Sequence, residues 1–98
     1  MPKPLNRADI EIKLSDLNGW HLEGGARTIA KRFIFDDFIQ AFAFMTRIAD
    51  VADAMNHHPD WANVYNRVDV RLSTHDAGGL TDKDFALAQS MDAIVPTH

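Results

Sequence analysis

The chain contains no cysteine, and this absence excludes several kinds of chemistry at once. Disulfide bonds, thiolate nucleophiles, zinc fingers and iron–sulfur clusters all depend on cysteine thiols, so this protein relies on none of them. A chain without cysteine also fits a reducing compartment. We therefore expect a cytoplasmic protein whose stability and chemistry rest on other residue types.

Long hydrophobic runs and an excess of positive charge are missing as well. No apolar stretch approaches the ~18–20 residues of a membrane span, and the polar start of the chain, with two early prolines, is unlike a signal peptide. Ten Lys and Arg stand against fourteen Asp and Glu, which gives a net charge of −4. Because non-specific affinity for nucleic acid comes mainly from positive charge, we expect neither nucleic acid nor membrane as a partner.

The composition of the chain is that of an ordinary globular domain. Hydrophobic residues make up 46% and charged residues 24% of its 98 residues. This length leaves room for one core, and no internal repeat, linker or low-complexity tract divides the sequence. We expect a single domain over residues 1–98, with an ordered core from about residue 6 to about residue 95.

Apolar residues at helical spacing predict a short helix over residues 7–17 and a longer one that ends near Met55. The short helix stops before Asn18-Gly19, and Asp36 or Asp37 is placed to cap the long one. The apolar stripe of the long helix consists of Phe38, Phe42, Met45, Ala49, Ala52 and Met55. We expect most of this stripe to cover the sheet of its own chain.

A third helix is predicted after Thr81, which forms a near capping box with Asp84 and precedes an apolar face. Pro96 stops this helix. Alternating apolar and polar residues predict a β-hairpin from residues 20–23 and 28–35, and a further strand over residues 64–72. The result is an α+β domain with helices on one face of a small antiparallel sheet, whose exposed edge favours a partner subunit.

Three of the five histidines, His57, His58 and His75, stand where these elements end, which is where functional side chains are commonly displayed. Histidine exchanges protons near neutral pH, so this group predicts an acid–base pocket. A metal site is disfavoured because adjacent residues point apart and the usual pair of histidines four residues apart is missing. We treat His21 and His98 as surface residues.

Neighbouring residues have plausible roles in such a pocket. Asp53 lies four residues before His57 and is spaced to pair with it on one helix face. Trp61 forms either a flat wall for a ring-shaped substrate or part of the hydrophobic core. Ser73 and Thr74 lack the strained glycine turn that surrounds a nucleophilic serine, so neither is predicted to be a nucleophile. Spacing and chemistry therefore predict a metal-free acid–base pocket, and they do not identify its substrate.

The residues around these histidines resemble the pterin-4a-carbinolamine dehydratase family. The resemblance is carried by Asn56-His57-His58-Pro59, Trp61, Asn63-Val64-Tyr65-Asn66, Leu72-Ser73-Thr74-His75 and Gly79-Leu80-Thr81 with Asp84. It implies a four-stranded antiparallel sheet with three helices packed on one face, in a homodimer or homotetramer. The alternation of apolar and polar residues predicts only three strands. We expect the fourth strand that the resemblance implies to come from the stretch around residues 61–64.

The resemblance also implies an activity, that of a hydro-lyase acting in tetrahydrobiopterin recycling. Members of the family remove water from 4a-hydroxytetrahydropterin to give the quinonoid dihydropterin, with no metal and no organic cofactor. By the same resemblance the catalytic residues are His57, His58 and His75, with His57 and His75 as acid–base groups and His58 orienting the substrate. The substrate-binding residues are Asp53, Asn56, Pro59, Trp61, Ser73 and Thr74, whereas Lys83 and Asp84 form a local structural pair.

Two alternatives stay open. Some animal members of the family stabilise dimers of a transcription factor through a helical surface, and here the corresponding candidate is the helix over residues 38–55. The same pocket is also compatible with another pterin-like compound as its substrate.

Overall fold

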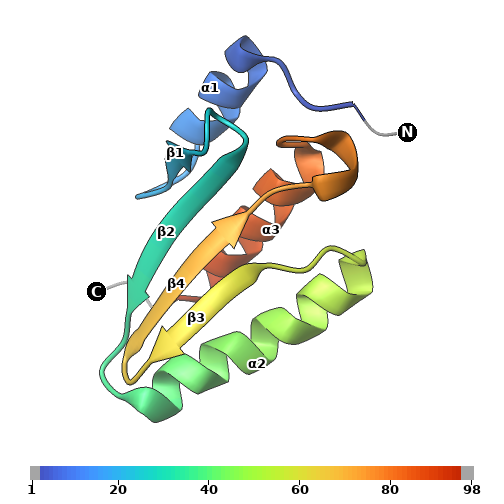
Figure 1. Ribbon diagram of the computed structural model, residues 1–98. Helices are drawn as coiled ribbons and strands as arrows, with labels where there is room; N and C mark the ends of the chain where they lie inside the picture. Colours follow the sequence, from blue (N-terminus) through green and yellow to red (C-terminus); the bar gives the residue numbers. More distant parts are fainter. Residues whose placement is uncertain (1–2, 96–98) are drawn as a thin grey trace.

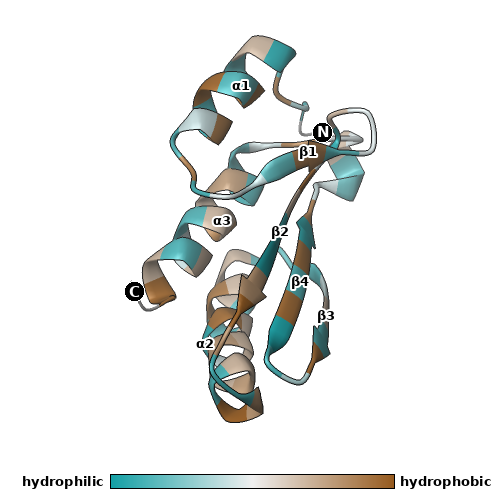
Figure 2. Cartoon of the chain, turned by 90° about the vertical axis from the view of Figure 1, so that its left-hand side faces the viewer, coloured by the Kyte–Doolittle hydropathy of each residue, from teal (hydrophilic) through white to brown (hydrophobic). Residues whose placement is uncertain are grey.

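The computed structural model describes residues 3–95, and over this range three α-helices lie on one side of a four-stranded antiparallel sheet (Figures 1 and 2). The strand order is β1-β2-β4-β3. This is the predicted α+β architecture. In chain order the elements are α1 (Arg7–Ser15), β1 (His21–Glu23), β2 (Thr28–Ile34), α2 (Phe38–Met55), β3 (Asp60–Val64), β4 (Arg67–Leu72), the 3-10 turn η1 (His75–Ala77) and α3 (Asp82–Ile94). Within residues 3–95, no helix is both long enough and apolar enough to cross a bilayer.

The helices α2 and α3 begin at the capping residues that the sequence predicts. The carboxylate of Asp37 accepts a hydrogen bond from the backbone N–H of Gln40 at the start of α2. Thr81 and Asp84 form a capping box at the start of α3. These two starts confirm the predictions from sequence. Pro96, predicted to stop the third helix, and His98, predicted to be a surface residue, lie outside the described residues.

The strand predicted over residues 64–72 is wrong in its first part, because a turn at Tyr65–Asn66 divides this stretch into the end of β3 and all of β4. Tyr65 has a φ of 50°, in the left-handed region that bulky residues rarely adopt, so its identity gives no turn signal. Asn66 holds the turn beside the end of β2, since its side-chain amide donates to the carbonyl of Phe35, the residue after that strand, at 2.9 Å. The strand β3 is the additional strand that the family resemblance implied.

The hydrophobic core fills the space between the sheet and the helices. The central strands β2 and β4 pair over six residues and direct alternate side chains toward the helices. Phe33 of β2 and Phe44 of α2 pack with ring centroids 4.9 Å apart. The fully buried side chains of the core include Ile29, Ile48, Val68, Val70, Leu72, Leu80, Leu87 and Met91. This rigid layer fixes the ends of α2, β4 and α3 relative to one another.

The face of α2 that packs against the sheet matches the predicted one only in part. Ala52 of the predicted stripe is buried, and Met45 and Met55 pack against the core. Ala41, Phe44, Ile48 and Ala52 are the buried residues of this helix. Phe38 and Phe42, which belonged to the predicted stripe, are 43% and 53% exposed. Because α2 is apolar around most of its circumference, spacing alone cannot select the buried face. The correction leaves an apolar surface on the outside of the molecule.

We predict that Ile48→Ala lowers the free energy of unfolding by about 2–5 kcal/mol, because Ile48 is completely buried and alanine leaves a cavity. Urea denaturation measures the change. Ile12→Ala on α1 is the matched control, since Ile12 is 64% exposed and its truncation should change stability by less than about 0.5 kcal/mol. Equal losses from the two variants would contradict the assignment of the core.

Candidate active site

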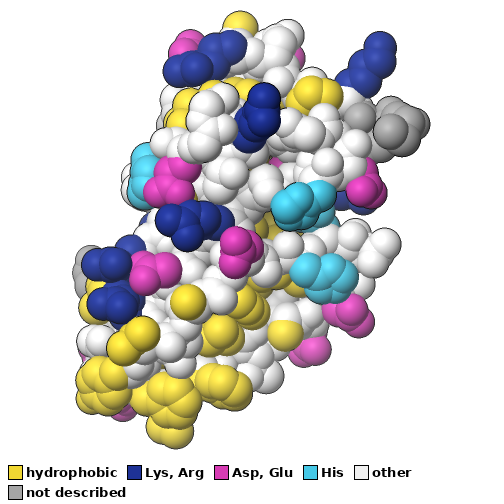
Figure 3. Space-filling model, in the orientation of Figure 1, with side chains coloured by type: hydrophobic (Ala, Val, Ile, Leu, Met, Phe, Trp, Pro, Cys, Tyr) yellow, Lys and Arg dark blue, Asp and Glu magenta, His cyan; other side chains and the backbone are white. Residues whose placement is uncertain are grey.

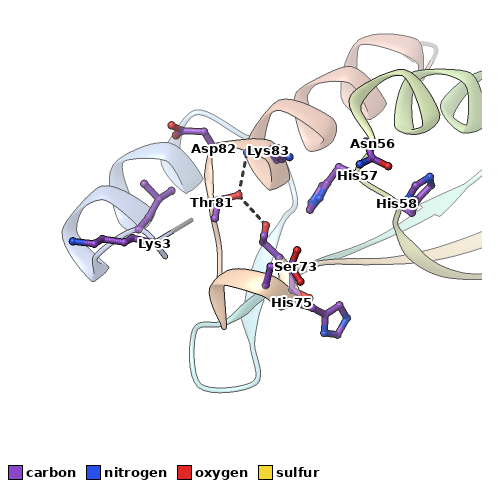
Figure 4. A pocket seen from close by; sticks show the side chains of 12 residues that line it. Lys3, Asn56, His57, His58, Ser73, His75, Thr81, Asp82 and Lys83 are labelled. Atoms are coloured by element: carbon purple, nitrogen blue, oxygen red, sulfur yellow. Dashed lines mark hydrogen bonds between the residues drawn. The ribbon is translucent and has the colours of Figure 1, made fainter. Parts of the chain in front are cut away.

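A pocket of about 470 Å³ opens where α2 ends, β4 ends and α3 begins (Figure 4). Figure 3 shows histidine side chains in the right-hand half of the molecule, over the same element ends. Three chain segments form the walls, and the N-terminal segment closes one side. The lining residues are Lys3, Leu5, Asn56, His57, His58, Ser73, Thr74, His75, Asp76, Thr81, Asp82 and Lys83.

The end of α2 sends its two histidines in different directions. Asn56 adopts the left-handed conformation, with φ 51° and ψ 43°, and closes the helix. The next backbone N–H, that of His57, donates to the carbonyl of Ala52 at 3.0 Å. As a result, His57 is buried, with 8% of its surface exposed, whereas His58 lies at the surface.

The opposite wall follows β4. Thr74 and Gly79 form an isolated antiparallel bridge that closes the loop between them. Inside this loop His75 begins the turn η1 and remains exposed. The backbone N–H of Leu5 donates to the carbonyl of Leu80 at 2.8 Å, which docks the N-terminal segment beside the same loop. This contact places Lys3 on the pocket wall, in a position that no local sequence pattern indicates.

Beneath the pocket lies Asp84, which has no exposed surface. Its Oδ1 atom is 2.6 Å from Nε2 of His57, and its Oδ2 atom accepts hydrogen bonds from the Thr74 hydroxyl at 2.8 Å and the Thr81 backbone N–H at 3.0 Å. The predicted local pair of Asp84 with Lys83 is therefore wrong. The carboxylate instead joins the three segments that carry the pocket, because the capping-box geometry turns it inward.

Asp53 also differs from the spacing-based expectation. It pairs with His58, with Oδ1 and Nε2 3.4 Å apart, and not with His57. Both side chains are exposed, at 87% and 61%, so solvent weakens this pair. The reason is the left-handed Asn56, which turns His57 away from the helix face that Asp53 occupies.

Six of the nine predicted site residues line the histidine pocket: Asn56, His57, His58, Ser73, Thr74 and His75. The other three, Asp53, Pro59 and Trp61, line a neighbouring hollow of about 440 Å³ between α2 and β3. His58 borders both spaces, and the half-buried Trp61 packs against the hydrophobic core. The predicted site therefore occupies two adjoining concavities.

Asp84 is a member of the site that was not predicted, although the sequence carries a signal for it. Asp84 precedes Ala88 and Met91 by four and seven residues, so helical spacing places its carboxylate on the buried face of α3. A charged group on such a face needs partners inside the protein. No comparable signal marks Lys3 or Leu5, whose positions depend on docking of the N-terminal segment.

His21 lies away from the pocket, at the surface as predicted. Its Nε2 atom is 3.0 Å from Glu23, which also accepts a hydrogen bond from Arg71 on the outer face of the sheet. The Arg71 hydrogen bond, with a smaller contribution from His21, lowers the pKa of Glu23. Arg32 lowers the pKa of Asp69 on the same face. These ion pairs belong to the sheet surface and not to the pocket.

The pocket contains the groups that proton transfer requires. Within residues 3–95, no cluster of three or more His, Asp or Glu side chains is arranged to hold a metal ion. The pocket offers three imidazoles, hydroxyl groups and the ammonium group of Lys83 (Figure 4). Imidazole and hydroxyl groups of this kind can exchange protons, and the buried Asp84 contacts one of the imidazoles, that of His57.

The chain belongs to the pterin 4 alpha carbinolamine dehydratase family, whose profile matches residues 3–94. A relative from Rhizobium etli, named "Putative pterin-4-alpha-carbinolamine dehydratase", is 54% identical over 88 residues, which cover 90% of this chain and 87% of the relative. A relative of the same name from Rhodospirillum rubrum is 47% identical over 95 residues, or 97% of this chain and 99% of the relative.

Solved structures show the same architecture. A transcriptional coactivator/pterin dehydratase from Brucella melitensis superimposes with a TM-score of 0.93 and 40% identity, over 96% of this chain and all of that chain. A pterin dehydratase-like protein, described as a RuBisCO assembly factor in the alpha-carboxysome, gives a TM-score of 0.70 at 22% identity, over 83% of this chain and 94% of that one. The second likeness shows a shared fold alone.

We predict that Thr74→Val destabilises the protein by about 1–3 kcal/mol, because valine cannot donate to the buried Asp84 carboxylate. Denaturant unfolding measures the difference. Thr46→Val on α2 is the control, since Thr46 is exposed and its hydroxyl bonds only a helix carbonyl. If the Thr74 variant lost no more stability than the Thr46 variant, the buried network would contribute little to folding.

Proposed function

We propose that this protein dehydrates 4a-hydroxytetrahydropterins to quinonoid dihydropterins by histidine acid–base catalysis. The observation that carries the proposal is the pocket in which His57, His58 and His75 meet, with His57 seated on the buried Asp84. Family membership and the names of the relatives support the same reaction. In a cell the product would be reduced again, so we place the protein in tetrahydropterin recycling.

The reaction is a balanced elimination of water. The C4a–O bond breaks, the hydroxyl group leaves as water after taking a proton from an acid, and a base removes the proton from N5. The electron pair left on N5 then forms the double bond to C4a. The step consumes no oxidant or reductant, and each well-placed acid or base contributes about 10²–10⁴-fold to the rate.

We assign the acid and base roles to His57 and His75, which approach the pocket from the ends of two different elements (Figure 4). Imidazole suits both roles because it gains or loses a proton near neutral pH. The two rings serve opposite stereoisomers of the 4a-hydroxyl group, and His58 orients the substrate. Asn56 and Ser73 provide hydrogen bonds to the pterin ring, whereas Thr74, whose hydroxyl group bonds Asp84 and Thr81, shapes the pocket wall behind it.

The remaining predicted substrate contacts belong to the neighbouring hollow. His58 borders both spaces and stands between a ligand in the histidine pocket and the other three residues, Asp53, Pro59 and Trp61. We therefore assign them a supporting role: Asp53 holds His58 through their 3.4 Å contact, while Pro59 and Trp61 face a substituent that extends beyond the ring.

A direct assay compares dehydration of 4a-hydroxytetrahydropterin at neutral pH with and without the protein. Wild type should accelerate the reaction above its spontaneous rate. His57→Ala and His75→Ala should each reduce kcat by about 10²–10⁴-fold, since each removes one proton-transfer group. His21→Ala, which removes an exposed imidazole outside the pocket, is the control and should retain full activity. Near-normal turnover by the His57/His75 double variant would refute the proposal.

We also propose that the protein forms a homodimer or homotetramer through an apolar end of the molecule. Exposed apolar side chains gather at the start of α2 and at the turn between β3 and β4, visible in the lower part of Figure 3. They are Ile34, Phe38, Ile39, Phe42, Val64 and Tyr65, with exposed fractions from 43% to 73%. A contiguous apolar surface of this kind commonly marks a protein interface.

Replacing Phe42 and Ile39 by Glu should reduce the molar mass in solution, because burying the new charges in an interface is unfavourable. Sedimentation velocity measures the mass, and circular dichroism checks that the fold is retained. Ile12→Glu, at an exposed site on α1, is the control and should leave the mass unchanged. A wild type that is monomeric, or a double variant of unchanged mass, would contradict this interface. Binding of a different protein at this surface would instead support the interaction-module alternative.

A further inference from the structure

We propose that Asp84 is a positioning residue that sets the tautomer of His57 and leaves Nδ1 of that ring as the proton-exchanging atom. The inference deepens the proposed dehydratase function and rests on it for its catalytic part. It starts from the 2.6 Å contact between Asp84 Oδ1 and His57 Nε2, in a region where Asp84 is fully buried and His57 is 8% exposed.

The hydrogen bonds around Asp84 all point toward its carboxylate. The Lys83 backbone N–H donates to the Thr81 hydroxyl oxygen, which in turn lies 2.8 Å from the Thr74 hydroxyl. With the Thr74 hydroxyl donating to Asp84 Oδ2, the Thr81 hydroxyl is the donor to Thr74. Thr81 adds its own backbone N–H to Oδ2. A chain with this polarity ends on the carboxylate of Asp84, whose Oδ2 atom accepts both hydrogen bonds.

An ionised carboxylate only accepts hydrogen bonds, so the His57 atom that faces it must carry a proton. That atom is Nε2, and in the neutral ring the unprotonated nitrogen is then Nδ1. Among the described residues Nδ1 has no hydrogen-bond partner, yet it is not one of the fully buried polar atoms without a partner. It therefore keeps contact with solvent. Because His57 lines the pocket, we place this contact there, where Nδ1 can accept a proton from a ligand.

The same carboxylate also fixes how the His57 ring is held. Its Oδ1 atom beside Nε2 holds the plane of the ring, so Nδ1 keeps one direction. Asp84 also binds Thr74, the residue before His75, so one side chain aligns both walls of the pocket. Because Asp84 belongs to the capping box of α3, the start of that helix and the orientation of His57 depend on each other.

The wild-type protein provides the first test, which needs no variant and no substrate. The ¹⁵N chemical shifts of the His57 ring are recorded by NMR while pH is raised until they stop changing. We expect a neutral ring protonated at Nε2 and unprotonated at Nδ1. A neutral ring protonated at Nδ1 would overturn the proposal, whatever the activity of the protein.

Asp84→Asn provides the second test. The two donors from Thr74 and Thr81 hold the amide oxygen, so the amide N–H faces Nε2 and forces the proton onto Nδ1. We expect the reversed tautomer in the NMR spectrum and a kcat reduced by about 10²–10⁴-fold, with KM changed far less.

Asp37→Ala is the matched control, because it removes the cap of α2 and leaves the contacts of His57 in place. It should lower stability while tautomer and kcat stay as in wild type. An Asp84→Asn variant that keeps the wild-type tautomer or loses no more kcat than Asp37→Ala would overturn the proposal. If Asp84→Asn does not fold, the wild-type spectrum decides. A wild type inactive on 4a-hydroxytetrahydropterin refutes the proposed function, and the spectrum still decides the role of Asp84.

Discussion

A carboxylate with no exposed surface must find its hydrogen bonds inside the protein, and the site of this molecule is arranged around that requirement. Asp84 meets it with Thr74, Thr81 and His57, which come from the end of β4, the start of α3 and the segment after α2. Each donor comes from a segment that also lines the pocket. Satisfying one buried charge therefore aligns three walls of the site and links local helix capping to the proposed chemistry.

The rest of the fold supports this arrangement by holding the three element ends at fixed positions. The paired central strands β2 and β4 and the buried face of α2 form a continuous core that ends beside the pocket. Exposed apolar groups lie at the opposite end of α2, so the surface proposed for self-association and the proposed catalytic site are separated along one helix (Figures 1 and 3). This separation allows assembly and activity to be tested independently.

Features set by neighbouring residues could be predicted from sequence. The caps at Asp37 and Thr81 are local, and the alternation of Val68, Val70 and Leu72 marks the buried face of β4. The turn at Tyr65 could not be predicted, because an aromatic residue in the left-handed region carries no local turn signal. The buried face of α2 was predicted only in part, since the apolar residues of this helix cover more than the face that packs against the sheet.

In the candidate site, too, only the features set by neighbouring residues could be predicted from sequence. The histidine segments could be located from short motifs, but the partner of His57 lies 27 residues along the chain and is set by tertiary packing.

The most direct test of the account is a crystal structure of the protein with a bound dihydropterin. We expect a pterin ring seated in the pocket, with His57 and His75 within hydrogen-bond distance of its N5 and C4a region. A pterin bound elsewhere, with both imidazoles out of reach of these atoms, would contradict it.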